Sequence, residues 1–488
     1  MEKEQEKKLQ EEILEEKDQV DLLYDLVKEQ ESYKDKTEFT GLLQKVVSFV
    51  LDNKEEKIST RTIDNMIADL DEQLSGQVDA ILHNETFQEI EAGWRSLRYL
   101  IDHTNFNENI KVRLLDISKE NLLEDFKDTM DIENSGLYKH AYTDQYNTAG
   151  GIPFGMIVGN YYISNSSDDL SLLKNLASVA TVAHAPFIGA VSSEFFGKSN
   201  MSELDKPKVI EDDLKDSNKY SAWRSFRETE DARNVGLVMP QFLLRTPYGP
   251  DSVKAKNFNY KEKAGDKHDD YLWGNAAFGF ASCVTRSFAE TRLGCNIIGE
   301  DSGGRVDDLP IYSYENMGIE QTRVPVEVQL DDRMEQVLSE AGFLPLVVKK
   351  GTSTATFYSS NSIQKVDENQ VDKDLQTNQR LGAMLSYNFI LSRFAHYLKT
   401  IQRSNLGSSK DRNALQDELN KWIIQYKSPE SALPAIKAKQ PLKEVSVTVT
   451  DSPGDPGWYK ISLELTPHYK YQGADFTLSL VGKIEKNK

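Results

Sequence analysis

The sequence predicts a mixed α/β protein with a helical N-terminal region, a central α/β domain and a C-terminal tail of β-strands. Three observations predict it. Between residues 154 and 191, a strand pattern, a helical pattern and a second strand pattern follow one another, which is typical of a βαβ unit with parallel strands. Residues 60–103 show helical periodicity, and three alternating strand patterns lie near the end of the chain.

The composition changes along the chain predict four regions. We expect a charged N-terminal arm and linker at 1–59 and a helical region at 60–105. An α/β domain at 106–320 and a C-terminal domain at 321–488 should follow. The arm is so densely charged that we expect either a helix stable only against a partner or partial disorder.

The helical region is expected to hold two helices, and the second carries an apolar stripe. Its large apolar residues recur at steps of three and four, which places them on one helix face. They are Phe87, Ile90, Trp94, Leu97 and Ile101. The commonplace explanation of such a stripe is a helix that packs on its own core, and the alternative is a helix that packs on a partner.

The central region is expected to alternate strands and helices. We predict a short strand at Lys111–Leu115 and a helix at Ser221–Ala232. The βαβ unit and a further strand of its sheet should lie at Phe154–Val158, Asp168–Ala183, Phe187–Val191 and Val235–Met239. The helix in this unit must end before Pro186, since proline disfavours the helical conformation in the residue before it.

The C-terminal region is expected to begin with a strand at Val324–Gln329 and a helix at Asp331–Ala341 that Gly342 closes. Two more helices should follow at about Asn378–Arg403 and at Asp411–Tyr426. The final strands are predicted at Glu444–Thr450, Trp458–Leu465 and Phe476–Gly482.

The overall composition excludes several classes of protein. The chain of 488 residues has a formal net charge of −20, which argues against binding to nucleic acid phosphates. No stretch approaches 18 uninterrupted apolar residues and the start lacks a secretory signal, so we expect no membrane insertion and a location in the cytoplasm. The only cysteines, Cys283 and Cys295, are expected to be buried thiols.

Motifs for catalysis are incomplete. Ser192 stands where a phosphate-binding loop ending at Lys198 would need glycine, and Glu300 stands where a nucleophile elbow around Ser302 would need glycine. The seven histidines are scattered without metal-ligand spacing. We therefore expect no catalytic residue, no cofactor and no metal site, and the protein should not be an enzyme.

Longer stretches resemble one known family. Residues 85–100 (ETFQEIEAGWRSLRYL) resemble a segment of the large subunit of the bacterial type VI secretion sheath, the TssC/VipB/IglB family. Further similar blocks are PFGMIVGNY at 153–161, AHAPFI at 183–188, WRSFRETEDARNVGL at 223–237, FLLRTPYG at 242–249 and YLWGNA at 271–276. Asn160 and Asn234 depart from the family pattern, which usually has aspartate and an aromatic residue there.

The resemblance covers roughly residues 84–484 and implies a contractile tail-sheath-like fold. It implies pairing with a small sheath subunit (TssB/VipA/IglA-like) and polymerisation with copies of itself around an inner tube of Hcp. It also implies a baseplate beneath the sheath and recycling by a ClpV-type ATPase, mainly through the small subunit. The sheath would contract to propel the tube.

The resemblance also implies roles for particular residues. Phe87, Ile90, Trp94 and Leu97 would form the small-subunit interface. Strand residues would take part in pairing between protomers, and these are Val445, Val447, Val449, Ile461, Leu463 and Leu465. The inner-tube contact would lie on the helix at Asp411–Tyr426, with Asp411, Asp417, Glu418 and Lys421. An ordinary intramolecular sheet and a solvated helix face remain the alternatives for these two groups.

Two other functions remain open at this point. The first is a sheath protein of a phage-tail-like contractile particle, which would use one sheath protein and no small partner. The second is an enzyme built on the βαβ core, which would need a pocket with perturbed acids or bases.

Overall fold

The computed structural model describes residues 60–129, 131–148, 150–250, 252–256, 258–265, 267–316, 319–366, 373–405, 411–451, 458–468 and 478–485. The chain forms two compact units, Met1–Gln77 and Val78–Lys488. Helix α3 (Thr60–Leu82) begins in the first unit, and its last residues belong to the second. The predicted arm at 1–59 lies outside the described residues.

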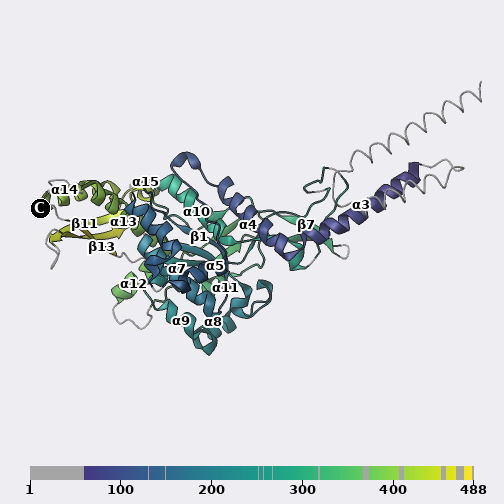
Figure 1. Ribbon diagram of the computed structural model, residues 1–488, viewed down its shortest axis with the longest axis horizontal. Helices are drawn as coiled ribbons and strands as arrows, with labels where there is room; N and C mark the ends of the chain where they lie inside the picture. Colours follow the sequence, from purple (N-terminus) through teal and green to yellow (C-terminus); the bar gives the residue numbers. More distant parts are fainter. Residues whose placement is uncertain are drawn as a thin grey trace, which may run out of the picture. The chain divides into compact units, whose positions relative to one another are not determined.

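A six-stranded sheet forms the centre of the second unit (Figure 1). Its order is β1 (Ile157–Ile163), β2 (Phe187–Val191), β3 (Val235–Met239), β9 (Phe343–Val348), β10 (Ala355–Phe357) and β6 (Arg305–Val306). The first four strands are parallel, and β10 is antiparallel to both of its neighbours. The mixed α/β class is confirmed.

Helices cover both faces of this sheet. Alternate residues of one strand point to opposite faces, so Phe187 of β2 joins one core cluster while Ile188 joins another. On the first face lie α7 (Ser167–Ala183) and α11 (Asp332–Glu340), and on the second lies α10 (Ala276–Thr291). The buried, nearly continuous apolar runs of β2 and β3 are typical of strands covered on both faces.

Most of the predicted elements are confirmed. The βαβ unit is β1–α7–β2 with a parallel strand pair, although β1 begins three residues later than predicted. Two helices occupy the predicted helical region, α3 and α4 (Glu85–Asp102). Helix α11 has Asp331 as its N-cap, and Gly342 after it adopts a φ of 90°, which only glycine adopts easily.

The prediction of one long helix at Asn378–Arg403 is wrong in one respect, because the structure has two helices there. They are α12 (Lys373–Gly382) and α13 (Leu385–Asn405). The break arises because the backbone there pairs with another segment. The Ser362 N–H donates to the Ala383 carbonyl oxygen, and the Leu385 N–H donates to Ser360.

Three other predictions are wrong in their boundaries or type. The segment Lys111–Leu115 is extended but joins no ladder among the described residues. At Val324–Gln329 only Val326 makes an isolated bridge, and the strand lies earlier, at β8 (Ile319–Arg323), since Pro325 has no N–H to donate. The helix from Ser221 ends at Arg227 (α9), and a 3₁₀ turn follows at Asp231–Asn234.

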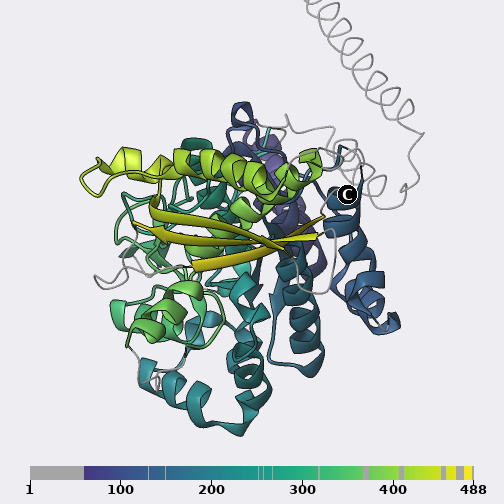
Figure 2. The ribbon, with the colours of Figure 1, turned by 90° about the vertical axis from the view of Figure 1, so that its left-hand side faces the viewer.

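The C-terminal strands form an antiparallel sheet in the order β11 (Leu442–Asp451), β12 (Trp458–Pro467) and β13 (Leu478–Glu485). Figure 2 shows these strands with helices packed along them. Helices α13 and α14 (Arg412–Ile423) share a hydrophobic core with β11 and β12. The three predicted strands and the predicted helix at Asp411–Tyr426 are confirmed.

The remaining elements are short. They are α5 (Lys119–Asp128), α6 (Gly136–Tyr138), a π-helix (Lys139–Asn147), α8 (Pro207–Asp216), β4 (Phe242–Leu243), β5 (Trp273–Gly274), β7 (Tyr312–Asn316) and α15 (Pro434–Lys439). Both cysteines are buried thiols. No helix among the described residues is long and apolar enough to cross a membrane.

Candidate partner-binding surface

Helix α4 packs on the body of the protein through its small residues. Ser96 is fully buried, and Leu100 packs with Phe278 and Ala281 of α10. A Cβ atom at Gly93 would lie 3.1 Å from Nδ2 of Asn160, so glycine permits this close approach. The side chain of Asn84 caps the helix by accepting a hydrogen bond from the Phe87 N–H at 3.3 Å.

The apolar stripe of α4 is consequently left largely uncovered within this chain. Ile90 is 57% exposed and Trp94 is 62% exposed, while Leu97 is half-buried beside Leu100. Phe87 and Ile101 are also exposed. The commonplace explanation of the stripe, a helix buried on its own core, therefore fails for its two central residues.

Ile90, Trp94 and Leu97 line a groove with a volume of about 1790 Å³. Its lining includes residues of α4, the extended segment 109–118 and strand β1, together with residues of α10 and α13. Phe87, the fourth residue predicted for this interface, does not line the groove, although it lies on the same helix. Large exposed apolar side chains facing one hollow are typical of an interaction site rather than of a free monomer surface.

The lining also includes the segment that we predicted as a strand. Its Leu114 is 66% exposed, and Leu115 and the nearby Ile152 are also exposed. One end of the segment is tied to β1, because the Tyr161 hydroxyl donates to the Ile117 carbonyl oxygen at 2.8 Å. Strand β1 is itself the edge of the six-stranded sheet. The groove therefore lies between an edge strand and an extended segment without a ladder partner.

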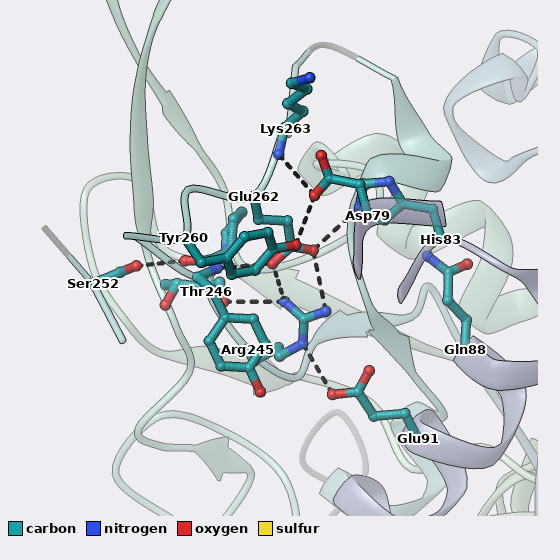
Figure 3. A network of polar contacts seen from close by, with 12 residues as sticks. Asp79, His83, Gln88, Glu91, Arg245, Thr246, Ser252, Tyr260, Glu262 and Lys263 are labelled. Atoms are coloured by element: carbon teal, nitrogen blue, oxygen red, sulfur yellow. Dashed lines mark hydrogen bonds and ion pairs between the residues drawn. The ribbon is translucent and has the colours of Figure 1, made fainter. Parts of the chain in front are cut away.

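A polar network fixes the other side of α4 to the loop at 244–265 (Figure 3). Arg245 donates from Nη1 to Glu262 Oε2 at 2.7 Å and from Nη2 to Oε1 at 3.1 Å. Its Nε donates to Glu91 Oε1 on α4 at 3.0 Å. The same Glu91 oxygen accepts from Arg95 at 2.7 Å, so one carboxylate joins the helix to the loop.

The network extends to the last turn of α3. The Tyr260 hydroxyl donates to Asp79 Oδ1 at 2.6 Å, and His83 Nε2 lies 3.2 Å from Glu262 Oε1 (Figure 3). Burial, followed by the Asp79 carboxylate, raises the pKa of Tyr260 well above its usual range, so its hydroxyl stays a donor. These bonds hold the wall of the groove in place.

The predicted inter-protomer strand residues face this chain's own core. Val447, Val449, Ile461, Leu463 and Leu465 are buried, and Val445 is partly buried. They pair in register across β11 and β12, for example Val447 with Leu463. Their side chains are therefore unavailable to another protomer, and only the main-chain edges of the sheet could pair with one.

The four predicted tube-contact residues are placed by α14. Asp411 caps the helix by accepting from the Ala414 N–H at 2.9 Å, and Glu418 accepts from Asn405 Nδ2 at 2.9 Å. Asp417 and Lys421 are exposed. Two of the four are thus occupied by local contacts, and a solvated face stays the alternative for the other two.

The site contains further residues that the sequence analysis did not single out. Leu114 and Leu115 were expected in a short strand and not in a binding site, and Arg245 and Glu262 were not considered at all. The signal for the pair was present, since Arg245 stands in the apolar run FLLRTP, where a charge needs a partner. Within the described ranges, no group of acidic, histidine or cysteine side chains could hold a metal ion.

Comparisons with known proteins agree across nearly the whole described chain. Residues 64–364 match the family model described as EvpB/VC_A0108, tail sheath N-terminal domain. Residues 374–484 match the model described as EvpB/VC_A0108, tail sheath gpW/gp25-like domain. The chain is also similar to the type VI secretion system sheath protein TssC1 of Pseudomonas aeruginosa, with 37% identity over 436 residues, which are 88% of this chain and 87% of that protein.

Proposed function

Since this chain belongs to the family of large sheath subunits of the type VI secretion system, we propose that it polymerises with a small sheath subunit into a contractile sheath. The sheath would surround an inner tube of Hcp, stand on a baseplate and contract to propel the tube. A ClpV-type ATPase would recycle contracted sheath, mainly through the small subunit. The role is structural, and the protein performs no reaction.

The observation that carries the proposal is the groove beside α4, which we propose as the binding site of the small subunit. Ile90, Trp94 and Leu97 form one wall, and Leu114 lies on the other. Burying a large apolar side chain contributes about 1.5–3 kcal/mol, so a partner segment that covers these residues gains several times that amount. One part of the lining is α4, the helix whose sequence carries the family resemblance.

The form of the groove favours an extended partner segment. Residues 110–117 are extended and join no main-chain ladder of the described part of the chain, and β1 is a sheet edge. A strand laid along either one would gain main-chain hydrogen bonds of about 1 kcal/mol net each. Its alternate side chains would then point toward Trp94 and Leu114, which supplies specificity.

Links between protomers are proposed at the edges of the C-terminal sheet. Strands β11 and β13 are its two outer strands. The buried residues of β11 and β12 fix the register of the sheet, and an added strand from another copy would pair through the main chain alone. Such a link can persist while the protomer bodies rotate, because it does not depend on the orientation of the bodies.

The tube contact is proposed on the exposed side of α14, at Asp417 and Lys421. Exposed ion pairs contribute only about 0–1 kcal/mol, which suits a contact that must be released on contraction. Asp411 and Glu418 already have partners within the chain, so the proposed contact is confined to the other two residues.

Co-expression with the neighbouring small-subunit gene tests the proposal. We expect a stable heterodimer and hollow sheaths visible by electron microscopy, and Trp94→Asp should abolish both while Arg98→Asp, on the same helix, should not. Sheaths formed by this chain alone would favour the phage-tail-like alternative. A wild-type chain that remains monomeric in the presence of the small subunit would refute the proposal.

A further inference from the structure

One arginine in the lining of the groove has no carboxylate partner among the described residues. It is Arg393 of α13. Its guanidinium carbon lies 5.0 Å from the ring centroid of Phe288 and 4.6 Å from that of Tyr397. Its Nε is buried without a hydrogen-bond partner, and no carboxylate of the described ranges pairs with it.

The extended segment supplies a second cation to the lining. Arg113 reaches only the amide oxygen of Gln145, at 3.4 Å, and lies 5.5 Å from the ring centroid of Phe154. Arg393 and Arg113 thus both line the groove, and neither forms an ion pair with a carboxylate of the described residues.

The nearby histidine adds no charge but offers an acceptor. His396, which also lines the groove, is buried, and its Nε2 lies 3.3 Å from the Ala183 carbonyl oxygen. Burial lowers the pKa of His396 to about 3, so the ring is neutral and Nε2 carries the proton that it donates. Its Nδ1, which has no partner in the structure, is left as an acceptor.

Carboxylates also line the groove. Glu85 and Glu89 of α4 belong to the lining together with Asp269, whose main-chain oxygen accepts from Gln88 at 2.9 Å. A partner segment in the groove therefore meets charges of both signs, and charge complementarity can select among partners.

We propose that Arg393 receives an aspartate or glutamate of the small-subunit segment that fills the groove, and that Arg113 adds positive charge to the same lining. The inference rests on the proposed function, because it names the chemistry of the same partner. Arginine suits this role, since its planar fork binds a carboxylate through two parallel hydrogen bonds.

Charge reversal tests the pair. Purified Arg393→Glu should bind the small subunit at least tenfold more weakly than the wild type in 150 mM salt, and Arg393→Gln should show a smaller loss. Lys350→Glu is the control, because Lys350 is exposed and does not line the groove, and this variant should bind normally. Substituting each acidic residue of the small subunit by arginine in turn should identify one position that restores binding to Arg393→Glu.

The outcomes separate the inference from the proposed function. Normal binding by both Arg393 variants, with Trp94→Asp still defective, would overturn the carboxylate pair and leave the groove intact. Loss of binding by Lys350→Glu as well would show that only total charge matters, which also overturns it. Thermal unfolding of each variant shows whether it folds. If Arg393→Glu does not fold, the binding of Arg393→Gln tests the inference in its place. Failure of the wild type to bind would refute the proposed function itself.

Discussion

Replacing Arg245 by methionine should destabilise the protein by about 3–5 kcal/mol, the typical cost of removing one partner from a buried ion pair. The side chain of Glu262 is only 1% exposed, so its carboxylate cannot turn to solvent. It would lose the hydrogen bonds at 2.7 and 3.1 Å and keep only the Tyr248 N–H at 2.8 Å and His83. Glu91 would suffer less, because Arg95 still donates to it.

The effect should be measured in two ways. Urea denaturation gives the change in the free energy of unfolding, and hydrogen exchange shows where the protection is lost. We expect faster exchange in residues 78–102 and in the loop 244–265, since Arg245 joins these two segments. Arg98→Met is the matched control, because its pair with Asp102 is exposed on both sides and should change stability by less than about 1 kcal/mol.

A double variant distinguishes the buried charge from the lost packing. Arg245→Met combined with Glu262→Leu removes both charges, and we expect it to recover at least half of the lost stability. If the double variant is as unstable as Arg245→Met, the penalty does not come from an unpaired Glu262 carboxylate. A loss below about 1 kcal/mol in Arg245→Met would also refute the reasoning.

Three further outcomes are expected. Trp94→Ala should leave the unfolding of the isolated chain within about 0.5 kcal/mol of the wild type, since the side chain is 62% exposed, yet weaken small-subunit binding at least tenfold in a pull-down titration. Leu463→Ala, fully buried in the C-terminal core, should instead cost about 2–5 kcal/mol in urea denaturation. Burial lowers the pKa of His184 to about 4 and that of His396 to about 3, so the unfolded chain binds protons that the folded chain does not. The free energy of unfolding should therefore fall by about 1 kcal/mol per histidine from pH 6.5 to 5.5. His184→Asn should reduce this dependence of stability on pH.

The central sheet could be predicted from sequence because its strands are local and distinctive. β2 and β3 are nearly continuous apolar runs, and the helix between β1 and β2 is bounded by a capping serine and by Pro186. The break between α12 and α13 could not be predicted, since it depends on hydrogen bonds to Ser360 and Ser362. Local periodicity carries no information about such distant partners.

The candidate site was predicted in part for the same reason. The stripe of Ile90, Trp94 and Leu97 follows from helical periodicity, but which face of α4 the body covers does not. Helix periodicity favours burial of the large residues, whereas the structure buries Ser96 and leaves Trp94 exposed. Arg245 and Glu91 lie 154 positions apart, so their pair could not be derived from spacing.

The apolar surface of the groove is not sufficient to account for a stable partner complex. Covering Ile90, Trp94, Leu114 and Leu115 would contribute about 6–12 kcal/mol if each side chain were fully buried. All four are already partly covered, so the true gain is smaller, and association costs an estimated 4–15 kcal/mol. The two amounts are comparable, so binding must depend on further interactions.

The extended segment and the arginines supply interactions of the required kind. Four or five main-chain hydrogen bonds to residues 110–117 would add about 1 kcal/mol each. A carboxylate at Arg393 would add a charge-assisted pair at a site where the guanidinium is already held between two rings. On this reasoning, truncating Trp94 and reversing Arg393 should each weaken the complex, and the two together should leave no measurable binding. A double variant that still forms sheaths would show that the small subunit is held elsewhere on this chain.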